Sequence, residues 1–470
     1  MLQKALTLLS GNAASALLLL ARNLAVAALI PLEDYGIAAT FAMTMALVEM
    51  STQFGLHQQI VQDKEGDSAH FQAAIQGFQI VRGVLAGVIL FRLATPIATL
   101  LRIPDIAWAY QVMALLPILR ALQHFDIHRF NRNLRYGPML LTGVVPGVVS
   151  LIVVFPFAVW LDDYRVMLFA LLLHETVALL TSHLTARRPY RVSFDRTILV
   201  RSIQFGWPLL VNGALLFLVM QGDKLIVGRE LGMAALGLFA MGVTLTLTPT
   251  LILAKSTQNF FLPQLSRAAQ TDSRAFTDLA HATCQAALLN GVVLVVTVAL
   301  IGIPIIGLLL GDKFAPLGPF LIWLAVAQAI RVCKSGPATS ALAKGVTTNA
   351  LWPNLVRVAG VPVAWWLVAN GGGLWAVILT ALCSELVSYA LALFLAKTRL
   401  NVPLKPFLPS LAVSVLFVAA LLSLASTKSV DPWLTLGIIT LGFAALTVTM
   451  GALRRVAHTA QRVPGLEQGG

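Results

Sequence analysis

Apolar runs of about 20 residues recur from one end of this 470-residue chain to the other. A helix of roughly 20 apolar residues is long enough to cross the hydrocarbon core of a bilayer. Charged residues make up 11% of the chain, whereas ordinary soluble domains carry about 25%. The chain is therefore predicted to be an all-α, polytopic membrane protein.

Fourteen membrane-spanning helices are predicted from the apolar runs. The first run is too long for the apolar core of a cleaved signal peptide, so we expect it to remain as the first span. The predicted spans cover residues 9–30, 36–56, 72–100, 106–124, 138–161, 164–185, 206–228, 234–262, 280–310, 317–343, 348–369, 373–396, 408–426 and 432–451.

An arginine-rich stretch separates the sixth and seventh predicted spans and begins Ala186-Arg187-Arg188-Pro189-Tyr190-Arg191. It is the most polar stretch of the chain and the natural boundary between two six-helix lobes. We predict an N-terminal lobe over 1–185, a basic linker over 186–203 and a C-terminal lobe over 204–397. Two further helices follow at 398–453, and a cytoplasmic tail at 454–470.

The positive charges indicate the orientation in the membrane. Cytoplasmic loops of membrane proteins are enriched in lysine and arginine. The loops after even-numbered spans and the tail carry this excess, whereas the opposite loops are balanced or acidic, as at Glu33-Asp34. We therefore predict that both termini are cytoplasmic, and attribute the net charge of +13 to this bias and not to nucleic-acid binding. The residues concerned are Arg129, Arg132, Arg135, Arg187, Arg188, Arg191, Arg196, Arg201, Arg267, Arg274, Lys397, Arg399, Lys405, Arg454, Arg455 and Arg462.

A weak internal repeat relates the two halves of the chain at an offset of 201 residues. Arg22 aligns with Asp223, Gly36 with Gly237, and both segments read helix, charged residue, short turn, glycine, helix. Repeats of this kind are common in transporters, which bind their substrates between the repeats. The pattern favours a transporter.

Ionisable residues inside the predicted spans are the candidate functional residues, because charges at membrane depth are costly and are usually kept for function. Nine cations face four carboxylates among them, with His174 counted as neutral. We expect these side chains to line a water-filled cavity that suits an anion such as a pyrophosphate-linked headgroup. The substrate-binding candidates are Arg22, Arg82, Lys255, Arg331 and Arg357.

Each of these residues also has a structural interpretation. Arg22 and Lys255 could instead form structural pairs or extend to the membrane surface, whereas Arg82, Arg331 and Arg357 lie too deep to extend easily. Three further cations are expected to extend to the surface because they lie near span ends, namely Arg92, Arg120 and Lys334. Asp223 and Lys224 form either a gate or a plain ion pair. The remaining carboxylates are either proton or sodium coupling sites or counter-ions to the arginines, namely Glu49, Glu175 and Glu385.

Several kinds of chemistry have no motif in this sequence. The phosphate-binding pattern GxxxxGK[ST] is absent, so nucleotide hydrolysis is not expected. Three cysteines lie in predicted spans without metal-ligand spacing, so neither zinc nor a disulfide is expected. His174 and Glu175 are adjacent on a helix and point about 100° apart, so they are not a catalytic dyad. We expect no cofactor and no enzymatic activity.

Three stretches resemble the oligosaccharide-lipid flippases of the multidrug/oligosaccharidyl-lipid/polysaccharide exporter superfamily. The first contains Ala21-Arg22-Asn23 and Pro31-Leu32-Glu33-Asp34-Tyr35-Gly36. The second contains Gly222-Asp223-Lys224 and Gly237-Leu238-Phe239-Ala240, and closes with Leu262-Pro263-Gln264-Leu265-Ser266. The third contains Ala343-Lys344-Gly345 and Gly371-Gly372-Gly373-Leu374-Trp375-Ala376. Together they extend over most of the chain.

The resemblance implies two six-helix lobes in a V-shaped arrangement, plus two C-terminal helices. It implies a flippase in the bacterial inner membrane that moves an undecaprenyl-pyrophosphate-linked oligosaccharide repeat unit to the outer leaflet by alternating access. The product would be O-antigen, exopolysaccharide or capsule. Membrane lipids and polysaccharide polymerases are then candidate partners, H⁺ or Na⁺ is the candidate coupling ion, and no nucleic acid is involved. Lys224 directly after Asp223 departs from the family pattern and weakens an ion-coupling role for that carboxylate.

Two other function classes remain open at this point. A multidrug or small-cation exporter of the same superfamily should show an excess of acidic residues in its cavity. A membrane-embedded polysaccharide polymerase or glycosyltransferase should carry a sizeable extramembrane segment with catalytic residues. The sequence has a cationic excess and short loops, so it favours the flippase over both.

Overall fold

The computed structural model describes residues 2–52, 54–133, 135–346, 348–425 and 432–461, and every regular element in them is helical. The predicted all-α class is confirmed. The chain divides into two compact units, Met1–Ala240 and Met241–Gly470, which we call unit 1 and unit 2. The boundary between them falls inside one helix, α11, and the lobe limits inferred from the basic linker stay a prediction.

Unit 1 holds ten α-helices and the first turns of an eleventh among its described residues. They are α1 (Leu2–Leu29), α2 (Leu32–Thr52), α3 (Leu56–Gln62), α4 (Ala69–Leu100), α5 (Ala107–Met113), α6 (Leu115–Ala121), α7 (Asp126–Arg132), α8 (Gly137–Leu161), α9 (Arg165–Thr185), α10 (Arg196–Ile226) and the start of α11 (Met233–Thr271). Two short helical turns, η1 (Pro104–Ile106) and η2 (Val227–Leu231), complete the unit.

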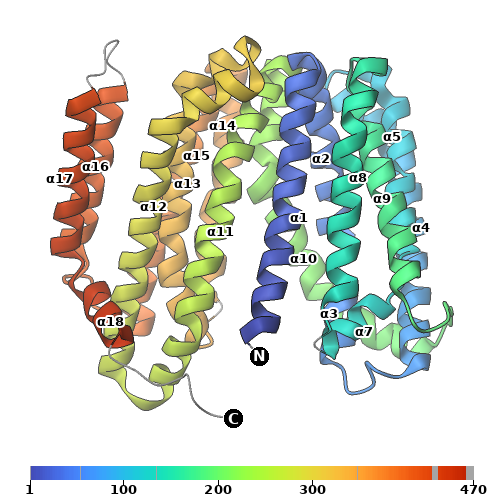
Figure 1. The fold of residues 1–470 in the computed structure, drawn as a ribbon, viewed down its shortest axis with the longest axis horizontal. Coiled ribbons are helices and arrows are strands. Elements are labelled where there is room, and N and C mark those ends of the chain that lie inside the picture. Colours follow the sequence, from blue (N-terminus) through green and yellow to red (C-terminus); the bar gives the residue numbers. More distant parts are fainter. Residues whose placement is uncertain (1, 53, 134, 347, 426–431, 462–470) are drawn as a thin grey trace. The chain divides into compact units, whose positions relative to one another are not determined.

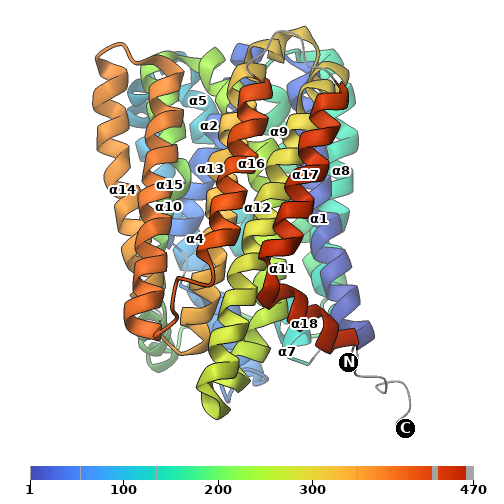
Figure 2. The same ribbon diagram turned by 90° about the vertical axis from the view of Figure 1, so that its left-hand side faces the viewer.

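Unit 2 contains the rest of α11 and seven further α-helices. They are α12 (Ser273–Leu310), α13 (Gly318–Ala343), α14 (Thr348–Ala369), α15 (Gly373–Leu400), α16 (Leu408–Ala425), α17 (Pro432–Thr449) and α18 (Gly451–Gln461), with one short turn, η3 (Asp312–Leu317). In Figures 1 and 2, α16 and α17 run side by side, and α18 crosses at one end of α17.

Every predicted span overlaps a helix, but the count of fourteen stays a prediction. Eight helices of the described chain are long and apolar enough to cross a membrane, and a ninth span results if the bent segment from Pro104 to Arg132 is counted as one. Shorter apolar helices cover Ala13–Leu29, Leu408–Leu424 and Trp433–Thr449. The chain is therefore a multi-pass membrane protein.

The fourth predicted span, 106–124, is not one continuous helix. It consists of η1, α5 and α6, with a break at Ala114. Pro117 lies one turn after the break and has no backbone N–H, so the carbonyl oxygen of Met113 lacks its usual intrahelical donor. Two loops expected after even-numbered spans, and the predicted tail, also contain the short helices α3, α7 and α18.

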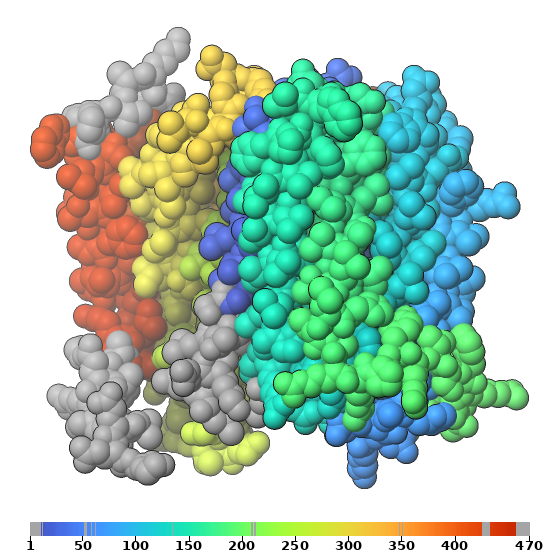
Figure 3. All heavy atoms as spheres, turned by 45° about the vertical axis from the view of Figure 1, so that its right-hand side comes forward, coloured from blue at the N-terminus to red at the C-terminus, as the bar shows by residue number. Residues whose placement is uncertain are grey.

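The outer face of unit 1 has the composition of a lipid-facing surface. Helices α8 and α9 form one such face, which Figure 3 shows from outside. Val159 on α8 is 90% exposed and Leu184 on α9 is 85% exposed. Large apolar side chains exposed in this number are costly in water and favourable against lipid.

Two glycines that the internal repeat aligned, Gly36 and Gly237, meet inside unit 1. A Cβ atom on Gly36 would overlap the carbonyl oxygen of Met233. A Cβ atom on Gly237 would lie 2.6 Å from the carbonyl oxygen of Leu32 and 3.2 Å from the backbone nitrogen of Gly36. The first turns of α2 and α11 therefore approach backbone to backbone, which small residues allow in membrane helices.

Replacing Gly36 with alanine is expected to destabilise the protein, because the new methyl group meets backbone and not a movable side chain. Overpacking of this kind costs about 1–3 kcal/mol. The measurement is the thermal unfolding midpoint of the purified protein in detergent. Gly437→Ala on α17 is the matched control, since its Cβ would meet nothing within 4 Å. Equal midpoints for the two variants would contradict the close approach.

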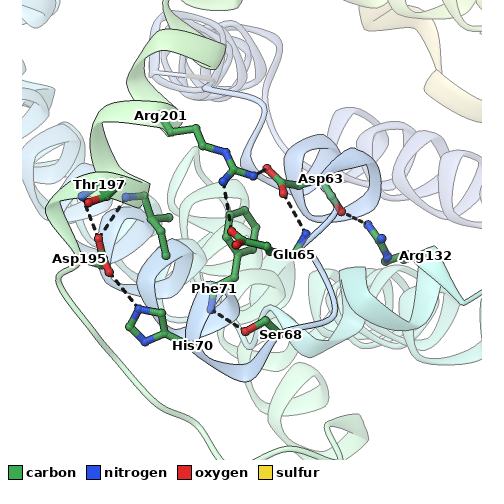
Figure 4. Close-up of polar contacts among 10 residues, drawn as sticks. Asp63, Glu65, Ser68, His70, Phe71, Arg132, Asp195, Thr197 and Arg201 are labelled. Carbon is green, nitrogen blue, oxygen red and sulfur yellow. Dashed lines mark hydrogen bonds and ion pairs between the residues drawn. The ribbon is translucent and has the colours of Figure 1, made fainter.

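The start of α10 is tied to the loop before α4 by ion pairs, drawn in Figure 4. Arg201 pairs with Asp63 and, at 3.1 Å, with Glu65. Asp195 caps α10 by accepting hydrogen bonds from the backbone N–H groups of Thr197 and Ile198, and it also contacts His70 at 3.0 Å. The bonds from His70 and from the two N–H groups lower the pKa of Asp195, so its negative charge complements the helix N-terminus.

The beginning of the basic linker is held by a buried carboxylate, Asp126. Its side chain accepts from Arg129 Nε at 2.5 Å and from the backbone N–H groups of Arg187 and Arg188 at 2.9 and 3.2 Å. Further along, the backbone N–H of Ser193 donates to the carbonyl oxygen of Ala73 on α4. These bonds fix the linker against the rest of unit 1.

We expect Asp126→Asn to release this part of the linker, because an amide cannot replace the charge or accept all three hydrogen bonds. Trypsin should then cut after Arg187 roughly tenfold faster, as expected when charge-assisted bonds of about 1.5–3 kcal/mol are lost. Asp105→Asn is the control, because Asp105 is exposed and has no polar partner in the described chain. Unchanged cleavage of Asp126→Asn would show that this carboxylate does not anchor the linker.

Candidate functional site

A cavity of about 360 Å³ lies within unit 1. It is lined by two predicted candidates, Glu49 of α2 and Arg82 of α4, and by Arg120 of α6. Gln79 and Gln123 add amide groups to the wall. The cavity is therefore polar and charged, although the helices that surround it are largely apolar.

Arg120 connects the two carboxylates of this region. Its Nη2 atom lies 2.6 Å from Oε1 of Glu175, its Nε atom lies 3.3 Å from Oε2, and it also pairs with Glu49. Gln123 donates a further hydrogen bond of 3.2 Å to Glu175. The expectation that Arg120 extends to the membrane surface is thus wrong: a carboxylate is within reach, and pairing satisfies both charges inside the bundle.

Arg22 of α1 is buried, with 7% of its surface exposed, and does not line the cavity. Its charge interacts with that of Glu175. The Nε and Nη1 atoms of Arg22 have no hydrogen-bond partner among the residues that the structure describes. A buried guanidinium with unsatisfied N–H groups is unfavourable on its own and is satisfied when an anion binds.

The predicted gate residues Asp223 and Lys224 lie at the end of α10, directly before η2. Both side chains are half-buried, and their charges interact with each other. This arrangement agrees with a local ion pair. The gate remains a prediction.

Unit 2 gathers three cations around one carboxylate. Glu385 of α15 is 1% exposed and is contacted by Arg331 Nε at 2.9 Å, Lys334 Nζ at 3.1 Å and Arg357 Nε at 3.0 Å. Lys334 also donates to the Ser388 hydroxyl at 3.0 Å. We call these four charged residues the Glu385 cluster. Lys334 belongs to it and does not extend to the membrane surface.

The Glu385 cluster carries two positive charges in excess. Arg331 and Lys334 lie one turn apart on α13, which places them on one face of that helix, and Arg357 comes from α14. Two predicted substrate-binding cations are thereby brought to the same carboxylate. An anion that reached this cluster would meet preorganised guanidinium and ammonium groups.

Lys255, the remaining predicted cation, is placed differently. It is exposed on α11, between the prolines Pro249 and Pro263, and has no ion pair in the described part of the chain. The structure does not bring it into the Glu385 cluster. Its predicted role in substrate binding stays a prediction.

The carboxylates are arranged as counter-ions. Glu175 accepts from Arg120 and Gln123, and Glu385 is surrounded by three cations. Each carboxylate is thus paired with cations from other helices, which is the arrangement of a counter-ion. The geometry favours the counter-ion role that the sequence left open for these two residues.

Sequence reasoning missed the polar side chains that complete the unit 1 cavity. Gln79 and Gln123 are ordinary helix residues in the sequence, and His57 and His128 lie in segments expected to be loops. The two imidazole rings are 5.6 Å apart at the cavity wall. No spacing rule connects α3 with α7, so only the folded chain shows this juxtaposition.

A family model described as polysaccharide biosynthesis protein matches residues 25–319 of the chain. No curated protein sequence matches this chain. The fold is similar to that of lipid II flippase MurJ in an inward closed conformation, with a TM-score of 0.71, 15% identity, and coverage of 97% of this chain and 100% of that one.

Two MATE transporters also share the fold. An inward-facing MATE family transporter of the MOP superfamily gives a TM-score of 0.66 at 14% identity, covering 82% of this chain and 94% of that one. A variant of the Vibrio cholerae MATE transporter VcmN gives 0.57 at 16% identity, covering 85% and 96%. At these identities the similarity establishes the fold, which is that of MOP-superfamily transporters.

Proposed function

This chain belongs to the polysaccharide biosynthesis protein family, and we propose that it is a flippase for a lipid-linked oligosaccharide. The substrate we propose is an undecaprenyl-pyrophosphate-linked repeat unit, moved from the cytoplasmic to the outer leaflet of a bacterial inner membrane. The product serves a surface polysaccharide such as O-antigen, exopolysaccharide or capsule. Both termini face the cytoplasm in this proposal.

The excess of cations at membrane depth is the observation that carries the proposal. Arg22 is buried, and two of its N–H groups have no acceptor in the part of the chain that the structure describes. The Glu385 cluster holds two more positive charges than negative ones. Charges are kept inside a membrane protein chiefly where they meet a substrate or an ion. A pyrophosphate is the part of the proposed substrate that these groups would bind.

The headgroup and the tail of the proposed substrate would lie in different surroundings, the first against these charges and the second in lipid. Guanidinium groups form paired, charge-assisted hydrogen bonds with phosphate oxygens. The polyprenyl tail is apolar and gains nothing from leaving the lipid, so it stays in the bilayer during transport. Alternating access then exposes the bound headgroup first to the cytoplasm and later to the outer side.

Two sources of energy remain for the transport step. An inside-negative membrane potential favours outward movement of an anion by about 2.3 kcal/mol per charge and 100 mV. A coupled H⁺ or Na⁺ gradient requires a carboxylate that takes up the proton or coordinates the sodium ion. Glu49 is the more accessible candidate, because it is exposed and shares its partner Arg120 with Glu175.

The alternatives are disfavoured by the same residues. A small-cation exporter would have to bind a positive substrate beside the Glu385 cluster, where three cations surround one carboxylate. A polymerase or glycosyltransferase needs a reactive group held ready for catalysis, whereas the carboxylates Glu175 and Glu385 are occupied by ion pairs. Transport without catalysis is the simpler account of this arrangement.

The proposal is tested in the host by deleting the gene and extracting the lipid-linked saccharides. We expect an undecaprenyl-pyrophosphate oligosaccharide to accumulate on the inner leaflet and to disappear when the wild-type gene is restored. A completed repeat unit already on the outer leaflet would reject the flippase and favour a polymerase. No accumulation at all would also count against the flippase.

A further inference from the structure

The basic linker encloses a second cavity in unit 1, of about 200 Å³. Its floor is the first part of α4, with Gln72 and Gln76, and His124 closes one side. The linker supplies Arg188, Tyr190 and Arg191 to the opposite wall. The cavity lies at the end of unit 1 that the arginine distribution predicts to be cytoplasmic. Its linker residues lie outside the predicted spans, and Gln72, Gln76 and His124 lie at the ends of the third and fourth predicted spans.

The walls of this linker cavity are positively charged. Two guanidinium groups line it, and none of its described lining residues is acidic. Asp67 approaches Arg188 at 3.7 Å but does not line the cavity. Arg191 is exposed and has no ion pair in the described ranges. A ligand of negative charge therefore suits the cavity.

Tyr190 offers an unused hydrogen-bond donor beside these arginines. Its hydroxyl group is buried and has no hydrogen-bond partner among the described residues. Its ring is held against His183 and His124, at centroid distances of 4.9 and 5.4 Å. Burial raises the pKa of Tyr190, so the hydroxyl keeps its proton at neutral pH and can donate.

The wall is rigid enough to form a preorganised site. His124 Nε2 lies 3.0 Å from the carbonyl oxygen of Arg188, which can only accept, so this nitrogen donates. Arg188 Nη1 donates to Oε1 of Gln72 at 3.2 Å. With the bonds to Asp126 described above, the linker backbone and one guanidinium are fixed before any ligand arrives.

We propose that the linker cavity binds a phosphate group, held by Arg188, Arg191 and the Tyr190 hydroxyl. Its volume is several times the roughly 30 Å³ that one water occupies in the liquid, so a phosphate ester with a small substituent fits. The ligand is either the headgroup of an anionic phospholipid or a soluble phosphate ester. This binding does not depend on the proposed transport, because the residues are distinct from those assigned to the substrate.

The test compares one charge inside the cavity with one outside it. Arg191→Gln removes a guanidinium from the wall, and Arg196→Gln removes the same charge from an exposed position on α10 that does not line the cavity. Tyr190→Phe removes the hydroxyl and keeps the ring contacts. The full-length protein is titrated in detergent with glycerol 3-phosphate, and in nanodiscs of phosphatidylcholine with or without one quarter phosphatidylglycerol, while the unfolding midpoint is followed.

We expect a phosphate probe to raise the midpoint of the wild type. Arg191→Gln should weaken that binding roughly tenfold and Tyr190→Phe several-fold, as for loss of a charged and a neutral hydrogen bond. Arg196→Gln should change it less than about twofold. Stabilisation by glycerol 3-phosphate identifies a soluble ligand, and stabilisation by phosphatidylglycerol alone identifies the lipid. The proposal is overturned if neither probe stabilises the wild type, or if both arginine variants lose binding equally.

Discussion

Replacing Glu385 with glutamine is expected to prevent stable folding of unit 2. The carboxylate is almost fully buried and is the shared partner of Arg331, Lys334 and Arg357. Without it, three cations lie close together at membrane depth, and breaking a buried ion pair on one side costs about 3–5 kcal/mol. Membrane insertion followed by fluorescence-detected gel filtration should show loss of the monodisperse peak.

A double variant that keeps the net charge of the Glu385 cluster unchanged separates electrostatics from packing. Adding Arg357→Gln to Glu385→Gln removes one of the stranded cations, so the double variant should be less unstable than the two single effects added together. Arg357→Gln alone leaves two cations on Glu385 and should fold. A Glu385→Gln protein as stable as the wild type would mean that this carboxylate does not hold the cluster.

Replacing Arg22 with glutamine is expected to abolish most transport while leaving stability unchanged or higher. The guanidinium is buried and its Nε and Nη1 atoms are unsatisfied within the described chain, so removing its charge relieves a cost in the empty protein. If those atoms bind pyrophosphate, their loss weakens substrate binding by about 10- to 100-fold. Unfolding midpoints and transport rates of the same preparation give the two quantities.

The opposite changes in stability and activity distinguish a binding role from a structural one. Arg22→Lys keeps the charge but not the planar fork, so it should retain part of the activity. Arg92→Gln is the control within the same unit, because Arg92 is exposed on α4 and lines neither cavity. An Arg22→Gln protein that transports normally, or that loses activity only because it unfolds, would remove Arg22 from the proposed site.

The sequence was sufficient to predict the helical class, and it singled out the charged residues that line the unit 1 cavity or form the Glu385 cluster. Apolar runs reveal membrane spans because a segment in lipid must satisfy its own backbone hydrogen bonds, which a helix does. The repeat offset also paired Gly36 with Gly237, which meet in the structure. The counter-ion alternative for Glu175 and Glu385 is also the one that the geometry favours.

The partners of these charges could not be predicted from the sequence. A single helix shows which residues share its face, but not which other helix that face meets. Arg120 and Lys334 lie near the ends of predicted spans and were expected to reach water, yet carboxylates from other helices are closer. The break at Ala114 and the linker cavity likewise depend on contacts between segments distant in the chain.

The most direct measurement is leaflet exchange in proteoliposomes that contain the purified protein and a polyprenyl-pyrophosphate oligosaccharide with a labelled sugar. We predict that the wild type exposes the labelled headgroup to a membrane-impermeant sugar-cleaving enzyme much faster than protein-free vesicles do. Arg22→Gln should reduce that rate by about 10- to 100-fold and Arg92→Gln should not. Exchange no faster than in protein-free vesicles, across both signs of membrane potential and with H⁺ and Na⁺ gradients imposed, would contradict the proposed function.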